Sequence, residues 1–384
     1  MPARVPSGGP SPARIMIIGE APGATEEVLG KPFVGSSGNL LDGMLSSAGI
    51  SRRECFVTNV CKYRPPRNDI TAWLTDKKAA AKRGGLTHTK GGRFYNDLVA
   101  EGLEELQEEI AAVQPQVIIG LGNAPLWALT DAWGIKAWRG SELQYNNIPF
   151  IPTYHPAYIL RAWGEKSIML HDLRTRVVAK MGRPETHATP PWRFVSNPTT
   201  EEAVDALAQL WGRLEGGPTW LACDTETRFC QITCVGFAWS NLDALCIPMM
   251  HVDGARWWDE ETENRLRTHI RSILMHPNVR LIGQNFNYDR QYFDADKPFG
   301  YAPQCAFDTH IAQHLLLPGT PKDLAYLSSL YCDWHSYWKD EGQAIASAED
   351  ELRWWWYNCR DTIATYEVAM KQMPALQRLG WINT

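Results

Sequence analysis

Two acidic residues stand two positions apart in segment 219–226, which reads Thr-Trp-Leu-Ala-Cys-Asp-Thr-Glu. The apolar run before them predicts a buried strand, and residues i and i+2 of a strand lie on one face of the sheet. Asp224 and Glu226 should therefore project together. Two carboxylates held that close repel each other unless a divalent cation lies between them. A metal site is one interpretation of this pair, and a solvated strand end is the other.

Two further polar pairs occur at helical spacing later in the chain. Asn285 and Asp289 follow a short apolar strand, and their i, i+4 spacing would put both on one face of a helix. Tyr357 and Asp361 have the same spacing. Asp308 follows another short apolar segment, and it is predicted to cap a helix or to support the site from behind.

These three pairs, in this order, resemble the three motifs of the DEDDy 3′→5′ exonucleases, most closely the proofreading domain of family A DNA polymerases. The flanking text agrees, with Cys234-Val-Gly-Phe-Ala-Trp, Phe307-Asp-Thr and Leu316-Leu-Pro-Gly. The resemblance covers about residues 192–379. It implies a ribonuclease H-like α/β domain that hydrolyses DNA from 3′ ends with two divalent cations, Mg²⁺ or Mn²⁺.

The same resemblance assigns roles around the cations. Asp224 would bridge the two ions. Glu226 and Asp361 would complete the site that binds the attacking water, and Asp289 would hold the second ion. Tyr357 would orient the water by a hydrogen bond.

Two residues are assigned to the DNA strand. Asn285 belongs to the second motif and would bind substrate. Phe229 follows the first motif, where it would either wedge between the terminal bases by stacking or lie buried beneath its own loop. The sequence leaves both interpretations of Phe229 open.

The first half of the chain carries a different series of motifs. In order they are Gly19-Glu20-Ala-Pro22-Gly23, Gly30-Lys-Pro-Phe33-Val-Gly35-Ser-Ser-Gly38, Thr58-Asn59-Val60, Arg64-Pro-Pro-Arg67-Asn68 and Thr153-Tyr-His155-Pro156. This series resembles the family 4 uracil-DNA glycosylases, over about residues 14–180.

Excision of a base requires that it leave the stack and enter a pocket. By the resemblance, Phe33 would stack on the uracil and Asn59 would read its edge. Cleavage leaves positive charge on the sugar and negative charge on the base, so Glu20 would act near the sugar and His155 near the base. Glycine-rich turns would bring backbone N–H groups close to phosphates, at Gly19 and Gly23.

The cysteines depart from that family. Its members usually carry four cysteines for an iron–sulfur cluster, whereas residues 1–13 contain none and Tyr63 stands where one is expected. Cys61 lies near that position without a companion. We therefore expect no iron–sulfur cluster. The nine cysteines show no paired spacing, which is typical of reduced thiols in the cytosol.

The 384 residues are too many for one ordinary core and indicate two α/β domains. Alternating strands and helices predict a three-layer α/β domain over residues 14–182. Within it, residues 62–93 hold nine Lys and Arg against two Asp, which predicts an exposed basic insertion with a short helix near 72–83. Three prolines mark a linker at 183–191. The second domain spans 192–384.

The net charge of −5 hides an asymmetry. Residues 1–190 hold 22 Lys and Arg against 18 Asp and Glu, a net of +4, and the remainder carries −9. Acidic side chains do not exclude DNA as a partner where they hold metal ions. We see neither an apolar run of about 18 residues nor a signal peptide. The sequence thus predicts no membrane partner and a cytoplasmic protein, in the host cytoplasm if a phage encodes it.

Three interpretations of the whole chain remain open. The first is a bifunctional enzyme of DNA replication or repair that trims single-stranded 3′ ends in proofreading and excises uracil. The second is an exonuclease whose glycosylase-like half only binds DNA or docks a polymerase. The third is the N-terminal part of a family A phage DNA polymerase, with the polymerase on another subunit or in a missing domain.

Overall fold

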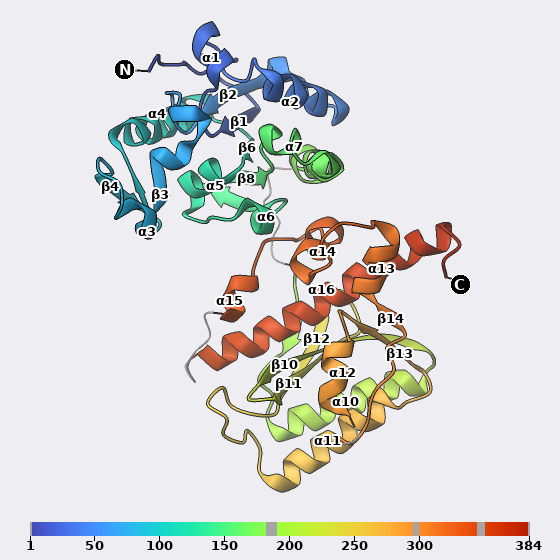
Figure 1. Ribbon diagram of the computed structural model, residues 1–384. Coiled ribbons are helices and arrows are strands. Elements are labelled where there is room, and N and C mark those ends of the chain that lie inside the picture. The colour runs from blue at the N-terminus through green and yellow to red at the C-terminus, as the bar shows by residue number, and fades with distance from the viewer. Residues whose placement is uncertain (1, 182–189, 295–298, 344–349, 383–384) are drawn as a thin grey trace. The chain divides into compact units, whose positions relative to one another are not determined.

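The computed structural model describes residues 2–181, 190–294, 299–343 and 350–382, and the chain divides into two compact units, Met1–His187 and Ala188–Thr384 (Figure 1). Each unit is an α/β structure built around its own sheet, as the sequence predicted. Most of the linker predicted at 183–191 falls outside the described residues. Within the described part of the chain, no helix combines the length and apolarity needed to cross a bilayer.

The first unit is built on a five-stranded sheet in the order β2-β1-β6-β8-β7. The first four strands are parallel, and β7 pairs antiparallel with β8 at the edge. Four of the five strands are almost entirely buried, because helices cover both faces of a mainly parallel sheet. The strands are β1 Ile15–Gly19, β2 Cys55–Asn59, β6 Val117–Leu121, β7 Leu143–Tyr145 and β8 Ile148–Thr153.

Helices flank this sheet on both sides (Figure 1). The longest, α4, begins where the Asn96 side chain accepts a hydrogen bond from the Val99 amide at 3.1 Å. Its apolar residues recur at helical spacing and pack with Met16 and Ile18 of β1. The helices are α1 Ala24–Leu29, α2 Ser36–Ser47, α4 Asp97–Val113, α5 Asn123–Thr130, α6 Ile135–Trp138, α7 Pro156–Ile159, α8 Lys166–His171 and α9 Val178–Lys180.

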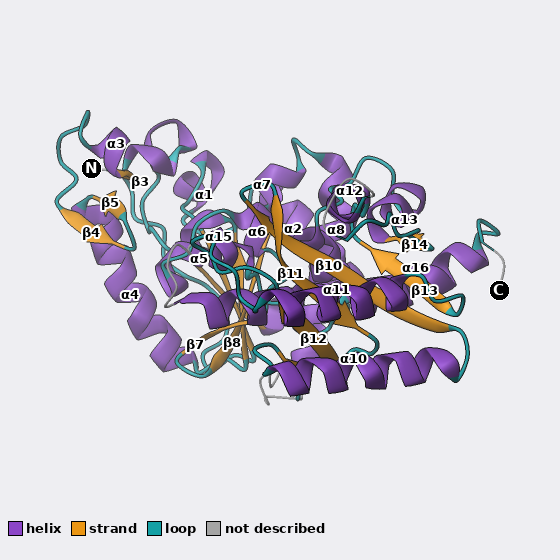
Figure 2. Ribbon diagram, turned by 90° about the horizontal axis from the view of Figure 1, so that it is seen from below, coloured by secondary structure: helices purple, strands orange, loops and turns teal. Residues whose placement is uncertain are grey.

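The basic insertion differs from its prediction. Instead of a helix over 72–83 it holds a small antiparallel sheet, β3-β5-β4, and the short α-helix α3 (Figure 2). Buried Leu74 pairs with Tyr95, and this long-range contact favours strands over the local helical preference of the alanines. The elements are β3 Leu74–Asp76, α3 Lys77–Ala80, β4 His88–Lys90 and β5 Arg93–Tyr95.

The second unit contains a six-stranded sheet in the order β14-β13-β10-β11-β12-β9. The central strands β10, β11 and β12 form an antiparallel meander, and the outer pairings are parallel. The strands are β9 Arg193–Val195, β10 Thr219–Arg228, β11 Gln231–Ala238, β12 Asp243–Pro248, β13 Val279–Gly283 and β14 Phe307–Asp308.

Two helices, α10 and α11, cover one face of this sheet, and the long helix α16 crosses the other (Figure 1). Leu221 and Cys223 of β10 pack toward α10 and α11, whereas Ala222 packs toward α16. The alternation puts Asp224 and Glu226 on the α16 side. The helices are α10 Thr200–Glu215, α11 Glu260–Leu274, α12 Asn287–Phe293, α13 Thr309–Leu316, α14 Leu324–Tyr331, α15 Lys339–Gln343 and α16 Glu351–Arg378.

Candidate active sites

Three carboxylates meet where β10 faces α16. Asp224, Glu226 and Asp361 each offer one oxygen, and the three oxygens lie within 4.8 Å of one another. Strand alternation brings the first two together, and the i, i+4 spacing after Tyr357 brings the third to the same face of α16. The structure thus joins the first and third motifs. The strand itself runs on to Arg228 rather than ending at Glu226, with a bulge after Glu226.

Asn358, which follows Tyr357 on α16, holds the first carboxylate in place. Its side-chain Nδ2 donates to Asp224 Oδ2 at 3.0 Å, and the residue is fully buried. A Cβ at Gly236 of β11 would lie 2.1 Å from Asn358 Oδ1, so only glycine lets α16 approach the sheet this closely. This contact could not be predicted from the sequence, because a buried asparagine within a helix has no local signature.

Asp361 accepts hydrogen bonds from two residues, Trp338 and Lys339, that were not predicted to belong to the site. Trp338 Nε1 donates to Asp361 Oδ1 at 2.7 Å, and Lys339 Nζ forms an ion pair with Oδ2. Lys339 also donates to the Tyr357 hydroxyl at 3.0 Å. Both residues come from the start of α15, more than twenty positions before Asp361, so no spacing pattern links them to the site.

The second motif is arranged differently from the prediction. Asn285 is not on a helix face with Asp289, because it precedes α12, is exposed and has a φ of 55°. Asp289 lies on α12 and is buried, and its Oδ1 accepts from the Thr225 amide at 2.9 Å and hydroxyl at 2.7 Å. Its carboxylate is therefore tied to β10 through Thr225, and Asp289 is not one of the three clustered residues. Its role toward a metal stays a prediction.

Asp308 confirms its predicted role as a helix cap. Its carboxylate accepts from the amides of His310 and Ile311 in the first turn of α13. The same carboxylate accepts from the Asn285 and Phe286 amides at 3.1 and 2.8 Å. One side chain therefore ends β14, begins α13 and fixes the turn that leads into α12.

The electrostatics of the cluster favour a cation. Burial, the Asp289 charge and the Glu226 charge together raise the pKa of Asp224 well above its usual range. Burial and the nearby Asp361 raise the pKa of Glu226 to about 8. The Lys339 ammonium already lies against Asp361, which shows where positive charge is stabilised. Clustered oxygen ligands of this kind suit Mg²⁺ or Mn²⁺.

Phe229 occupies the tip of the β10–β11 turn. Its side chain is 65% exposed, which rules out burial beneath the loop and leaves the base-wedge interpretation standing as a prediction. Phe229 and Cys230 have φ values of 50° and 59°, so this two-residue turn places two non-glycine residues in the left-handed region.

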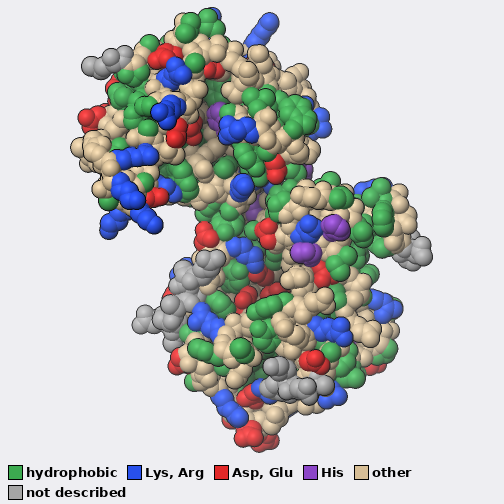
Figure 3. Space-filling model, in the orientation of Figure 1, with side chains coloured by type: hydrophobic (Ala, Val, Ile, Leu, Met, Phe, Trp, Pro, Cys, Tyr) green, Lys and Arg blue, Asp and Glu red, His purple; other side chains and the backbone are tan. Residues whose placement is uncertain are grey.

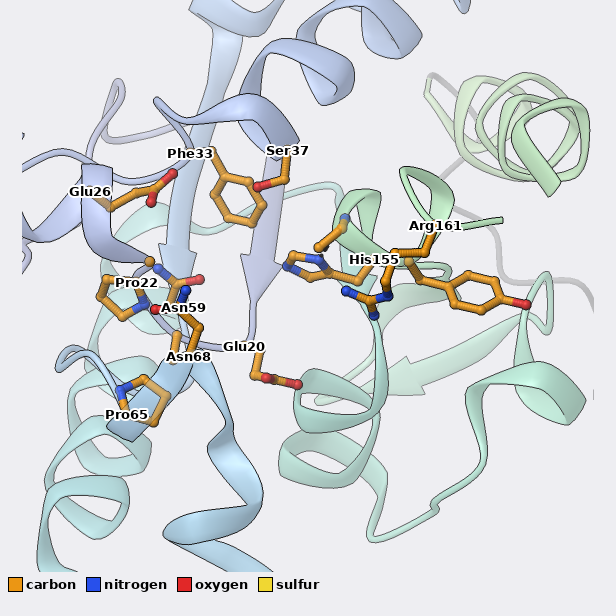
Figure 4. A pocket seen from close by; sticks show the side chains of 14 residues that line it. Glu20, Pro22, Glu26, Phe33, Ser37, Asn59, Pro65, Asn68, His155 and Arg161 are labelled. Carbon is orange, nitrogen blue, oxygen red and sulfur yellow. Dashed lines mark hydrogen bonds between the residues drawn. The ribbon is translucent and has the colours of Figure 1, made fainter. Parts of the chain in front are cut away.

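A second site opens at the carboxyl ends of the parallel strands in the first unit, where α/β proteins bind ligands. It is a pocket of about 260 Å³, large enough for one base. Figure 4 shows Phe33, Asn59, Glu20 and His155 around this hollow. The structure therefore brings together all four residues that the sequence assigned to uracil and its sugar. Gly23 also lines the pocket.

Asn59 and Phe33 form one wall. The Asn59 side chain is 4% exposed, and its Oδ1 has no hydrogen-bond partner among the described residues. A Cβ at Gly19 would lie 2.3 Å from that oxygen and 2.4 Å from Phe33 Cζ, so glycine permits the close approach. Phe33 has a φ of 54°, and Glu26 secures its loop by accepting from the Val34 and Gly35 amides at 3.1 and 2.9 Å.

The backbone behind Asn59 rests on a buried ion pair. Lys62 Nζ donates to the Asn59 carbonyl at 3.0 Å and to Glu109 Oε2 at 2.8 Å. Burial lowers the pKa of Lys62, opposed by Glu109. Removal of one partner would leave a buried charge, which typically costs about 3–5 kcal/mol. Lys62 therefore holds the backbone of Asn59 in place. In the sequence, Lys62 was recognised only as part of the basic insertion.

His155 is neutral, and its geometry defines the tautomer. Burial and the Arg161 charge lower the pKa of His155 to about 4. Its Nδ1 accepts from the Ala157 amide at 3.1 Å, so the ring proton must lie on Nε2. The imidazole is tilted toward Phe33, with ring centroids 5.8 Å apart. His155 can therefore donate one hydrogen bond to a ligand stacked on Phe33.

Glu20 has an unusual proton affinity. Burial is the main cause and Asp69 adds to it, while Arg161 opposes them, and the pKa of Glu20 rises to about 7. Arg161 and Asn68 also line the pocket, and neither was assigned a role from the sequence. Cys61 lies nearby but is buried, and its thiol donates to the Leu98 and Tyr63 carbonyls. The predicted absence of an iron–sulfur cluster stays a prediction.

Comparison with known proteins gives a family match in each unit. The family model of the uracil DNA glycosylase superfamily matches residues 6–174, and that of the 3′-5′ exonuclease matches residues 197–377. The type-4 uracil-DNA glycosylase of Archaeoglobus fulgidus is 50% identical over 166 residues, which are 41% of this chain and 71% of that protein. That of Pyrobaculum aerophilum is 32% identical, over 41% of this chain and 73% of that protein.

Other likenesses are more distant. A DNA polymerase of Bacillus phage SP01 is 26% identical over 166 residues, 43% of this chain and 16% of that protein. Among solved structures, the catalytic core of RRP6 from Trypanosoma brucei covers 51% of this chain and 50% of its own, at 16% identity and a TM-score of 0.37. The EXD2 exonuclease domain covers 50% of this chain and 98% of its own, at 15% identity and a TM-score of 0.24.

The site geometry and the family matches lead to one conclusion. The chain belongs to the type-4 uracil-DNA glycosylase family through its first unit, and its second unit matches the model of a 3′-5′ exonuclease domain over residues 197–377.

Proposed function

We propose that the second unit hydrolyses DNA from its 3′ end with two divalent cations. The observation that carries this proposal is the cluster of Asp224, Glu226 and Asp361 oxygens within 4.8 Å. These three residues would hold the cations, with Asp289 on the side of the second ion. The ions would supply an activated water and neutralise charge on the leaving 3′ oxygen.

The side chains around the cluster prepare that reaction. Asn358 keeps Asp224 turned toward the cluster, and Trp338 fixes the rotamer of Asp361. The Tyr357 hydroxyl lies one helical turn from Asp361, where it can orient a water by a hydrogen bond. Phe229 and the turn at Asn285 would contact the terminal nucleotides from outside.

We further infer that the first unit excises uracil from DNA. The carrying observation is the buried, unpaired Oδ1 of Asn59 beside the Phe33 ring. Uracil presents an N–H donor next to a carbonyl acceptor, and a side-chain amide pairs with both. Leaving such a buried group unpaired is costly, so a ligand with this edge is favoured.

The reaction follows from the charges that develop. The bond between the sugar C1′ and uracil N1 breaks, its electron pair stays on the base, and water adds to C1′. Ionised Glu20 would stabilise the positive sugar. His155 Nε2–H would donate to the oxygen of the departing base, because the Ala157 amide occupies Nδ1 and leaves the ring proton on Nε2.

One assay tests both activities in the chain of residues 1–384. Labelled oligonucleotides with and without a central uracil are prepared, each with a free 3′ end or a protected one. They are incubated in Mg²⁺ or EDTA and then treated with alkali, which cuts the strand at abasic sites. A 3′ ladder only in Mg²⁺ supports the exonuclease, and a uracil-dependent cut that persists in EDTA supports the glycosylase. An intact exonuclease without uracil-dependent cutting would reduce the first unit to a DNA-binding or docking module.

Replacement of Lys339 by methionine should tighten cation binding. The wild-type ammonium pairs with Asp361 Oδ2 and must yield that oxygen to a metal ion. We expect the Kd for Mn²⁺, measured by calorimetry without DNA, to fall about fivefold to tenfold, or ~1–1.4 kcal/mol. Lys371→Met, at an exposed position of α16, is the matched control and should leave the Kd unchanged. Equal or weaker binding by K339M would contradict this competition.

Uracil excision should depend on pH through Glu20. The raised pKa of about 7 means that the carboxylate is mostly protonated below that pH and ionised above it. We expect the single-turnover rate, measured in EDTA from about pH 5.5 to pH 9, to rise with pH and to be about tenfold lower at pH 6 than at the plateau. His155, whose pKa is about 4, stays neutral throughout this range. Glu20→Gln should be slow and lack this rise; a flat wild-type profile would exclude Glu20 as the titrating group.

We place the protein in DNA replication or repair, because 3′ trimming and uracil removal both correct newly made or damaged strands. The likeness to a phage DNA polymerase supports a family A polymerase as its partner, on a separate subunit or in the same polypeptide. Co-elution with such a polymerase in gel filtration is the corresponding test.

A further inference from the structure

The basic insertion of the first unit presents positive charge that its own fold does not neutralise. Figure 3 shows Lys and Arg side chains gathered over the region that Figure 1 labels α3, β3 and β4. Five of them are exposed and have no carboxylate within ion-pair distance among the described residues; we call these the basic face: Arg67, Lys77, Lys78, Lys82 and Arg83. By contrast, Arg64 pairs with Glu27 and Lys90 with Asp131.

The basic face rests on a fixed support. Asp76 caps α3 by accepting from the Ala79 amide at 2.8 Å, which holds Lys77 and Lys78 on the first turn. The insertion is also tied to the rest of the unit, because the Arg93 guanidinium stacks 3.8 Å from the Trp133 ring. The basic side chains are therefore carried by secondary structure that packs against the rest of the unit.

The basic face continues from the rim of the uracil pocket. Pro65 and Asn68 line that pocket (Figure 4), and Arg67, which is exposed, lies between them in the sequence. The chain then enters the turn at 70–72, and Arg83 donates to the Thr71 carbonyl, which draws the end of α3 back against this turn. A path of basic side chains thus leads away from the pocket wall.

We propose that the basic face binds the phosphates of the DNA strand whose base enters the pocket. The pocket of about 260 Å³ accommodates one base, so the flanking nucleotides must lie outside it. Clustered ammonium and guanidinium groups without acidic partners repel each other, and a polyanion relieves that repulsion. This proposal rests on uracil excision by the first unit and adds where the strand runs.

The test compares two double variants that each lose two positive charges. Lys78→Gln with Lys82→Gln alters the basic face. Arg14→Gln with Arg53→Gln alters exposed residues that precede β1 and β2. They lie at the amino-terminal ends of these strands, whereas the pocket lies at the carboxyl ends. Binding to a labelled single strand without uracil is followed by anisotropy in EDTA, from about 50 to about 400 mM salt.

We expect the lysine variant to bind about tenfold more weakly at low salt and its salt slope to fall by about 1.4, while the arginine variant behaves as wild type. Equal slopes for the two variants would overturn the proposal. Because this strand lacks uracil, the result is independent of catalysis. Failure of excision in every variant would refute the proposed reaction alone, whereas an unchanged slope with intact excision would refute the basic face alone.

Discussion

Replacement of Asp224 by asparagine is expected to lower the exonuclease rate by about a thousandfold or more. The substitution removes the negative charge of Asp224, which lies beside the Glu226 and Asp361 carboxylates. The proposed cations would therefore lose one of their three clustered ligands. The hydrogen bond from Asn358 can persist to the asparagine carbonyl, so the geometry should survive. Degradation of a labelled single strand in Mg²⁺ measures the effect.

The thermal stability of the same variant separates lost chemistry from lost folding. Burial and the charges of Asp289 and Glu226 raise the pKa of Asp224, which means that its ionised form opposes folding. A neutral residue should therefore leave Tm equal or slightly higher. Asp205→Asn, on an exposed position of α10, is the matched control and should retain full activity. An Asp224→Asn protein with activity within tenfold of wild type would refute the metal cluster.

Replacement of Asn59 by alanine should abolish most uracil excision. Without the amide, the N–H and carbonyl of uracil would enter a closed pocket with no partners, and sites built to pair with such groups lose about 10⁴-fold or more when pairing fails. We expect kcat/KM for a uracil-containing strand to fall by at least about a thousandfold. The exonuclease ladder should be unchanged, because Asn59 belongs to the other unit.

A matched substitution controls for simple truncation of an amide. Asn39→Ala lies on an exposed position of α2 away from the pocket lining and should excise uracil at the wild-type rate. Retained excision by Asn59→Ala would show that the unpaired oxygen has no part in recognition. Loss of excision by both variants would point to a fault in folding, which the melting curve would reveal.

The parts of the sites that lie on regular elements were predictable from the sequence. Strand alternation put Asp224 and Glu226 on one face, and helical spacing put Asp361 one turn from Tyr357. On β10 and α16 the backbone geometry repeats, so the spacing of residues in the sequence predicts which face of the element each side chain lies on. Glu20 and His155 were assigned to one site by the resemblance to the uracil-DNA glycosylases alone.

The failures occurred where the backbone leaves that geometry. Asn285 has a positive φ before α12, so the helical spacing to Asp289 does not apply. Lys339 and Trp338 reach Asp361 from a separate segment, and only tertiary packing shows this. The strands of the insertion are three residues long, too short for alternation to outweigh a run of alanines and lysines.

Asp308 shows how a residue outside the chemistry can be as constrained as the residues within it. Its one carboxylate serves the turn into α12 and the first turn of α13 at once. Any replacement must satisfy both segments together, and only an aspartate has the two oxygens and the short reach to do so. Position 308 should therefore tolerate as little variation among related exonucleases as the metal ligands do, and a ranking of positions by invariance alone would mistake this architectural residue for a catalytic one.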